Sequence, residues 1–274
     1  MTARIDAHHH VWRVARGDYG WLTPDLPICR DYGLDDLRPH LAETGITGTV
    51  LVQAAPTEAE TDFMLAAMDA AAGLVRGVIG WVPFDAPDRV EARLADPRIV
   101  GIRPMLHDLT DETWVLWPEH AAALRAVTRW GKAFDALIRP VHLHTIGVLA
   151  DRHPDLRIVI DHCAKPAIRE LMWEPWASGL ADLAERPNIF CKLSGLLTEA
   201  GGRDVVRHAR HVLDCFGAGR VMFGSDWPVL ELAGRYVDWF AAVDALLDPA
   251  ARAAVLGGTA IRFYRLGQYG EETT

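Results

Sequence analysis

Two histidines and one aspartate, far apart in the chain, are the strongest candidates for chemistry. His8 and His10 form an H-x-H pair at the end of an apolar run, and Asp226 ends another apolar run near the other end of the chain. Because side chains alternate between the two faces of a strand, His8 and His10 must point the same way and His9 the other. A lone H-x-H pair could equally be structural. If the first and last strands are neighbours in a barrel, however, the three side chains converge, and they could hold a metal or activate water.

Short β-rich runs alternate with helical patterns along the chain, which predicts a parallel sheet. The runs are apolar on both faces, as buried parallel strands are. Eight such runs in 274 residues suit one barrel of about 250 residues. We therefore expect an α/β fold, a (β/α)8 TIM barrel, formed as a single domain over residues 1–274. The predicted strands are 3–7, 49–53, 75–82, 99–103, 132–137, 157–161, 188–193 and 220–224, with helical spacing at, for example, 58–72, 117–130, 139–152, 176–186 and 203–216.

Composition and charge argue against several other kinds of function. The net charge is −9, and no run of Lys or Arg is long enough to follow a phosphate backbone, so nucleic acid is not an expected partner. No apolar stretch reaches the roughly 20 residues of a membrane span, and no secretion signal is recognisable at the N-terminus. The four cysteines show no C-x-x-C pairing. We expect a cytoplasmic protein with reduced thiols.

In TIM barrels the reactive side chains collect at the carboxyl ends of the strands. Charged groups in such apolar surroundings are costly unless they are paired or functional, so many of them together indicate an active site. Asp135 and Lys192 could instead form a buried ion pair, and Lys165 could simply be solvated. The polar residues at the predicted strand ends are His8, His10, Gln53, Arg103, Asp135, Asp161, His162, Lys165, Lys192, Ser194 and Asp226.

The longest connection without helical spacing follows the first predicted strand, over residues 12–34. It contains Trp12, Tyr19, Trp21 and Tyr32 among Gly and Pro residues. A loop after a barrel strand lies at the catalytic face, where aromatic rings can form the wall of a pocket. We expect such rings to contact the substrate, although they could equally pack the loop against the rim of the barrel.

These residues, taken together, resemble the amidohydrolase superfamily, and within it the lactonase branch of sugar-lactone hydrolases and 2-pyrone-4,6-dicarboxylate lactonases. The matching segments cover nearly the whole chain in the family's order. Two of them, GDYGWL at 17–22 and QAAPT at 53–57, look closest to members similar to L-fuconolactonase. The others are IDAHHHVW at 5–12, GIR at 101–103, FD at 134–135 with RP at 139–140, VIDH at 159–162 with KP at 165–166, CKLSG at 191–195 and MFGSDWP at 222–228.

The resemblance implies a metal site, with one departure. Superfamily sites take an H-x-H pair from strand one, a histidine each from strands five and six, and an aspartate from strand eight. Here Asp135 ends strand five, and the next histidines fall in the following helical segment. We therefore expect no strictly required cofactor and room for one divalent ion, Zn²⁺ or Mn²⁺. Its candidate ligands are His8, His10 and Asp226, with His162 as a fourth.

The function that this resemblance implies is hydrolysis of a sugar aldonolactone, such as L-fucono-1,5- or 1,4-lactone, to the aldonic acid. A carboxylate must take a proton from water and return it to the leaving hydroxyl, and a donor must stabilise the oxyanion. The catalytic candidates are Asp226, His8, His10 and His162. The substrate-binding candidates are Trp12, Trp21, Gln53, Arg103, Lys165, Lys192 and Trp227.

Three other hypotheses stay open at this point. A 2-pyrone-4,6-dicarboxylate lactonase or a metal-dependent decarboxylase of the same superfamily would share the H-x-H pair and the strand-eight aspartate. A dicarboxylate favours two arginine clamps, whereas Arg103 is the one arginine at these strand ends. A barrel that binds a sugar acid without catalysis belongs to a different class. In each case the expected partner is a small molecule, and the chain could form a homo-oligomer.

Overall fold

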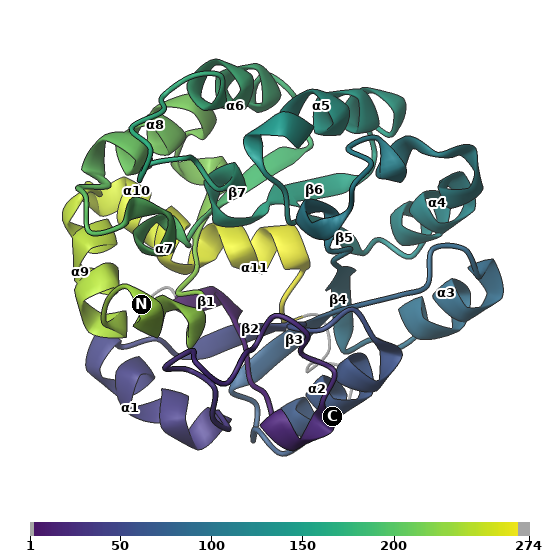
Figure 1. Ribbon diagram of the computed structural model, residues 1–274, viewed down its shortest axis with the longest axis horizontal. Coiled ribbons are helices and arrows are strands. Elements are labelled where there is room, and N and C mark those ends of the chain that lie inside the picture. The colour runs from purple at the N-terminus through teal and green to yellow at the C-terminus, as the bar shows by residue number, and fades with distance from the viewer. Residues whose placement is uncertain (1–2, 268–274) are drawn as a thin grey trace.

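Eight parallel strands form one sheet that closes on itself, with helices around it (Figure 1). The computed structural model describes residues 3–267. Each strand pairs with the next one along the chain, so the sheet order follows the sequence from β1 to β8. This confirms the predicted (β/α)8 barrel. The strands are β1 (Ile5–His9), β2 (Gly48–Val52), β3 (Val75–Gly80), β4 (Ile99–Ile102), β5 (Ala133–Ala136), β6 (Arg157–Ile160), β7 (Ile189–Leu193) and β8 (Val221–Phe223).

The two ends of the sheet meet through backbone hydrogen bonds made by the candidate site residues. The backbone N–H of Asp226 donates to the carbonyl of His8 at 2.8 Å, and the N–H of His10 donates to the carbonyl of Trp227 at 2.7 Å. The first and last strands are therefore neighbours, which is the condition for His8, His10 and Asp226 to meet.

The strand β1 contains a bulge at the histidines. Asp6 pairs with Thr49 and His9 pairs with Leu51, so β1 has one residue more than β2 between these two pairs. His9 turns away from the barrel interior and contacts the Thr49 hydroxyl at 2.9 Å through Nε2. The rings of His8 and His10 lie together on the other side, with centroids 4.9 Å apart. The predicted orientation of the three histidines therefore holds.

The helices surround the barrel, except that α11 (Thr259–Tyr264) lies across it (Figure 1). Within residues 3–267 no helix combines the length and the apolar character needed to cross a membrane. The remaining helices are α1 (Leu34–Thr44), α2 (Glu58–Asp69), α3 (Pro87–Leu94), α4 (Ala121–Arg129), α5 (Leu143–Arg152), α6 (Trp176–Ala184), α7 (Leu196–Ala200), α8 (Val206–Phe216), α9 (Tyr236–Ala245) and α10 (Pro249–Ala253).

The helix α11 closes the end of the barrel at which the strands begin. Its residues Ala260, Phe263 and Tyr264 have the i, i+3, i+4 spacing of one helix face. That face packs against interior side chains of the strands, among them Ile5 and Met222. The other end of the barrel, where the strands terminate, is left for the site.

Candidate active site

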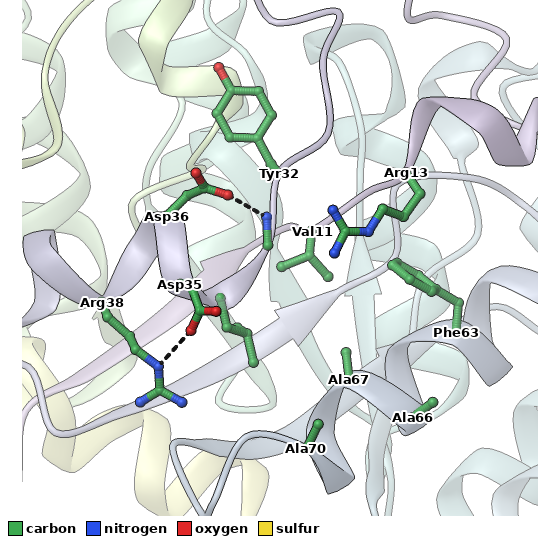
Figure 2. Close-up of a pocket in the computed structure, with 12 residues that line it drawn as sticks. Val11, Arg13, Tyr32, Asp35, Asp36, Arg38, Phe63, Ala66, Ala67 and Ala70 are labelled. Atoms are coloured by element: carbon green, nitrogen blue, oxygen red, sulfur yellow. Dashed lines mark hydrogen bonds and ion pairs between the residues drawn. The ribbon is translucent and has the colours of Figure 1, made fainter.

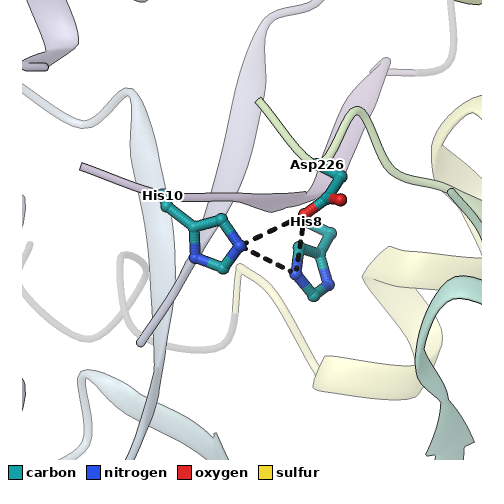
Figure 3. A group of neighbouring side chains, drawn as sticks. All are labelled: His8, His10 and Asp226. Carbon is teal, nitrogen blue, oxygen red and sulfur yellow. Dashed lines mark hydrogen bonds and ion pairs between the residues drawn. The ribbon is translucent and has the colours of Figure 1, made fainter. Parts of the chain in front are cut away.

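Three buried side chains meet where β1 ends and β8 is followed by its loop, and we call them the His–Asp group: His8, His10 and Asp226 (Figure 3). The two histidine Nε2 atoms are 3.3 Å apart. Asp226 Oδ1 lies 3.3 Å from the Nε2 of His10 and 3.8 Å from that of His8. The structure thus brings together three residues that are widely separated in the sequence.

The nitrogen atom that His10 presents to this group is a hydrogen-bond acceptor. His10 Nδ1 is 2.8 Å from the carbonyl oxygen of Val52, which can only accept, so Nδ1 carries the hydrogen and Nε2 a lone pair. Burial, with Lys192 nearby, lowers the pKa of His8 well below its usual value, so this ring is neutral. Imidazole nitrogens and a carboxylate oxygen therefore face one another. All three residues offer ligand atoms within 4.8 Å of one another, a donor set that fits one divalent ion such as Zn²⁺.

Two glycines allow the rings of His8 and His162 to lie close to the neighbouring strands. A Cβ at Gly224 would lie 2.8 Å from the Cβ of His8. A Cβ at Gly195, which has a φ of +66°, would lie 2.6 Å from the Cβ of His162. A larger residue at position 224 would displace His8, and one at position 195 would displace His162.

A fourth ring, that of His162, reaches the same group from a strained turn after β6. Four successive residues that are not glycine, 162 to 165, have φ between +50° and +60°. Conformations of this kind cost about 1–3 kcal/mol per residue and cluster at functional sites. The turn places His162 Nε2 at 3.7 Å from Asp226 Oδ1, while its Nδ1 contacts the Ser194 hydroxyl at 2.9 Å.

The carboxyl group of Asp226 is held in its ionised form. Burial alone would raise its pKa, but the neighbouring rings of His162 and His10 outweigh burial, and the pKa falls below the usual 3.8. Asp226 is therefore a carboxylate at neutral pH and can accept a proton.

Deeper in the barrel lies a second set of charges, which we call the inner ion cluster: Asp135, Asp161 and Lys192. All three are completely buried. Lys192 contacts Asp135 Oδ2, lies 3.0 Å from Asp161 Oδ1 and reaches His8 Nδ1 at 3.1 Å. The hydroxyl of Tyr264 on α11 donates to Asp135 at 2.8 Å. The ion pair that the sequence left open as an alternative for Asp135 and Lys192 is therefore present.

The two aspartates of the inner ion cluster differ in their pKa. Burial, together with the nearby charge of Asp161, raises the pKa of Asp135 above its usual value. Asp161 is equally buried, yet the charges of Lys192 and Arg103 and its contact with His8 hold its pKa well below the usual range. Asp161 is thus the permanently negative member of the cluster.

Arg103 connects the inner ion cluster with the His–Asp group. One of its terminal nitrogens lies 3.1 Å from Asp161 Oδ2 and 3.3 Å from His8 Nε2. The other contacts the carbonyl oxygen of Gln53, and the Gln53 amide donates back to the Arg103 carbonyl at 2.9 Å. The guanidinium group is therefore held on both sides.

A cavity of about 220 Å³ opens beside the His–Asp group at the carboxyl end of the barrel. Ionisable and apolar side chains are mixed in its wall, which is typical of sites for small polar molecules. Half of the lining residues are ones that the sequence had singled out. The wall consists of His10, Trp21, Arg103, His162, Lys165 and Asp226, together with Ala54, Met105, His107, Asp108, Leu137 and Val229.

A family model for amidohydrolases matches residues 5–266. The chain belongs to the amidohydrolase family. Two proteins named L-fucono-1,5-lactonase are similar over almost their whole length. The one from Burkholderia ambifaria is 45% identical over 97% of each chain, and the one from Burkholderia multivorans is 36% identical over 96% of each. These relatives are hydrolases that act on lactone ester bonds, the enzyme class that the sequence predicts.

A solved structure of another amidohydrolase has a backbone fold similar to that of this chain. An amidohydrolase from Burkholderia multivorans, crystallised with bound zinc, aligns with a TM-score of 0.90 at 33% identity. The alignment covers 96% of this chain and 99% of that one.

Four predicted substrate-binding residues lie behind the wall of the cavity in the described structure. Trp12 is buried among the rings of its own loop, 5.3 Å from those of Trp21 and Tyr32. Trp227 is also buried, and its indole N–H donates to Glu231 at 2.8 Å. The other two are the fully buried Lys192 of the inner ion cluster and Gln53, which holds Arg103.

The cavity beside the His–Asp group is also lined by residues that were not predicted from the sequence. His107 and Asp108 follow β4 in a short 3-10 turn, Leu106–Asp108. They come a few residues after Arg103, so a search extended past the last residue of each strand would have found them. The apolar residues of the wall carry no comparable signal.

Two of the larger hollows on the surface of residues 3–267 are lined by none of the three residues of the His–Asp group. One, between α1 and α2, is lined by charged residues that bind one another or the backbone (Figure 2). Asp36 accepts from the N–H of Gly33 at 2.8 Å, and Arg38 pairs with Asp35 at 3.3 Å. The other adjoins the cavity beside the His–Asp group and is lined by tryptophans and Phe84. The His–Asp group therefore marks the site better than cavity size does.

Proposed function

We propose that this amidohydrolase hydrolyses a neutral aldonolactone of a six-carbon sugar, with L-fucono-1,5-lactone as the first candidate. The observation that carries the proposal is the meeting of an ionised Asp226 with His8 and His10 at the wall of a cavity large enough for one sugar ring. The two L-fucono-1,5-lactonases that are 45% and 36% identical to this chain support the choice of substrate.

In the proposed mechanism Asp226 is the general base. Its lowered pKa leaves it ionised at neutral pH, so it can accept a proton from a water molecule that attacks the lactone carbonyl. When the tetrahedral intermediate collapses, the same proton passes from Asp226 to the ring oxygen, which leaves as a hydroxyl group. The lone pair of His10 Nε2, fixed by the bond of Nδ1 to Val52, helps to orient the water.

The developing oxyanion needs donors that do not have to reorganise. Arg103 and Lys165 both line the cavity. Arg103 is held by Asp161 and Gln53, and Lys165 is held by Glu199 at 2.9 Å. These two cations face the substrate in fixed positions, and His162 is a third candidate donor.

The wall also suits a deoxy sugar rather than a dianion. Met105, Leu137 and Val229 offer apolar surface for a methyl group. Arg103 already has Asp161 at 3.1 Å, so its charge is partly neutralised. A dicarboxylate would therefore meet too little positive charge to offset its desolvation.

We propose further that one divalent cation can be held by His8, His10 and Asp226, and that hydrolysis does not strictly require it. A bound metal ion would polarise the lactone carbonyl and lower the pKa of water. Strand five supplies Asp135, which is engaged by Lys192 and Tyr264 and is not free to act as a further ligand. Treatment with a chelator should lower the activity but leave part of it. Complete loss, restored by added Zn²⁺ or Mn²⁺, would contradict the second part of this proposal.

The test is a panel of aldono-1,4- and 1,5-lactones assayed with a pH indicator, since each hydrolysis releases a proton. We expect the highest kcat/KM with L-fucono-1,5-lactone or a close epimer. 2-Pyrone-4,6-dicarboxylate serves as the dianionic comparison. Faster hydrolysis of the pyrone than of every aldonolactone would refute the substrate, and no hydrolysis together with tight binding of an aldonate would favour a sugar-acid binder.

A further inference from the structure

The ring of Trp21 is held at the cavity wall by a hydrogen bond of its own. Its indole N–H donates at 2.8 Å to the carbonyl of Ala54, the second residue after β2. Ala54 and Trp21 both line the cavity. Because the donor is part of the indole, this bond fixes the ring itself, and not only the backbone of its loop, against a residue of the wall.

A buried carboxyl group, that of Glu60 on α2, lies behind this part of the wall. Glu60 is completely buried. Its Oε1 accepts from the backbone N–H of Ala54 at 3.0 Å, and its Oε2 accepts from the hydroxyl of Tyr19 at 2.8 Å. A guanidinium nitrogen of Arg16 lies 3.3 Å from Oε2. One side chain therefore holds Ala54 and also the loop two residues before Trp21.

These hydrogen bonds tie the indole ring to the interior along two routes. One runs from Trp21 through Ala54 to Glu60, and the other runs from Glu60 through Tyr19 back to the loop. Burial raises the pKa of Glu60, and the bonds from Ala54 and Tyr19 oppose that shift. A buried acid is costly unless its partners stay in place. The ring therefore cannot leave its position without breaking a bond in this set.

We propose that Glu60 is a positioning residue, which fixes the ring of Trp21 where the lactone binds and thereby lowers KM. This inference rests on the proposed function and adds a residue behind the substrate cavity to it. Glu60 is not among the residues that line the cavity, so it acts on the substrate through Trp21. The ordinary alternative is that Glu60 joins α2 to the loop and contributes to stability alone.

Two substitutions loosen the ring, and a third removes it. Glu60→Ala deletes both acceptor oxygens, whereas Tyr19→Phe deletes one donor and keeps its ring. Each is made in the wild-type enzyme and in Trp21→Ala, in which no ring is left to position. Ser178→Ala is the control, because it deletes a hydroxyl bond to another glutamate, Glu174, at 2.7 Å and outside the cavity wall.

The experiment measures kcat and KM for L-fucono-1,5-lactone. Tyr19→Phe should raise KM about fivefold, and Glu60→Ala should raise it at least as much, while kcat stays close to the wild-type value. In Trp21→Ala neither substitution should raise KM further, because residues that act through one another are not additive. Ser178→Ala should leave KM unchanged.

Three outcomes overturn the inference. A lower melting temperature with unchanged KM in both variants would mean that Glu60 only stabilises the fold. An equal rise in KM with and without the ring of Trp21 would mean that Glu60 acts by another route. A fall in kcat without a rise in KM would place its effect on the reaction step. If Glu60→Ala does not fold, Tyr19→Phe decides between these outcomes.

The position of Trp21 can also be followed without any substrate. Enzyme labelled with 5-fluorotryptophan contains ten labelled rings, and the fluorine signal that disappears in Trp21→Phe belongs to residue 21. This signal should shift in Tyr19→Phe and stay in place in Ser178→Ala. If wild-type enzyme hydrolyses no aldonolactone, the proposed function fails by itself. A shifted signal would then still support the positioning of Trp21, and an unmoved signal would overturn the inference as well.

Discussion

The inner ion cluster and the His–Asp group lie at different depths of one barrel and differ in how their charges are matched. In the cluster, Lys192 lies between two aspartates, and the whole set is sealed beneath α11. In the His–Asp group, two imidazole nitrogens and a carboxylate oxygen face one another at the wall of an open cavity. Matched buried charges contribute to a single fold, whereas a carboxylate and imidazole rings beside a cavity can bind a proton or a cation. One ring, His8, belongs to both through its two nitrogens.

The largest effect should come from removing the cation of the inner ion cluster. Lys192→Met leaves Asp135 and Asp161 without their shared partner, and a buried pair broken on one side costs about 3–5 kcal/mol of unfolding free energy. Urea denaturation measures this loss. Adding Asp135→Asn should recover part of it. Full stability with lost activity would instead place Lys192 among the residues that act on substrate.

A change in the His–Asp group should lower the activity of the enzyme and leave its stability nearly unchanged. Asp226→Asn removes the proposed base and should lower kcat by about a hundredfold or more, while the free energy of unfolding changes little. Steady-state kinetics and denaturation of the same preparation test both statements. Asp238→Asn, an exposed residue of α9, is the control. Turnover near the wild-type value would remove Asp226 from the mechanism.

Tyr264→Phe tests the seal between α11 and the cluster. The variant deletes one hydrogen bond to the buried carboxyl group of Asp135, worth about 1.5–3 kcal/mol when the acceptor is charged. The raised pKa of Asp135 allows protonation in the variant, so we expect the lower part of that range. Calorimetric melting should show the shift at unchanged kcat. A tenfold fall in kcat would mean that the two regions are coupled.

The smallest effect should be that of pH, because we expect kcat/KM to stay constant across the neutral range. The pKa of Asp226 lies below 3.8, so kcat/KM falls only when the pH drops through that acidic value and the base becomes protonated. Burial lowers the pKa of His8 and of His162 well below 6.5, so neither ring should titrate near neutrality. Initial rates from pH 5 to 8, corrected for spontaneous lactone hydrolysis, test this. An inflection between pH 6 and 7 would contradict it.

The order of elements and the residues at strand ends could be predicted from the sequence, because a parallel barrel places all carboxyl ends on one side. His8, His10, His162 and Asp226 follow from that rule. The depth at which a polar residue lies in the barrel does not follow from that rule. Lys192 is one residue short of the end of β7, and that single step puts it in the sealed interior instead of the cavity.

Two other features had no signal in the residue types. The left-handed turn of residues 162–165 contains no glycine or asparagine, so its residue types do not predict a positive φ. Trp12 carries the same aromatic character as Trp21, yet it packs into its own loop while Trp21 reaches the cavity. Which ring faces the substrate depends on the path of the loop, which the composition does not encode.

The position of α11 has a consequence for the assembly of the chain during synthesis. A ribosome makes all eight strands before it makes this helix, which contributes Tyr264 and the apolar face that seals the barrel floor. Until α11 docks, Asp135 lacks its hydrogen bond from Tyr264 and the end of the barrel beneath the inner ion cluster lacks its apolar cover. The docking of α11 therefore comes after the last strand has been made, and completion of the barrel depends on a segment that is not itself part of the sheet.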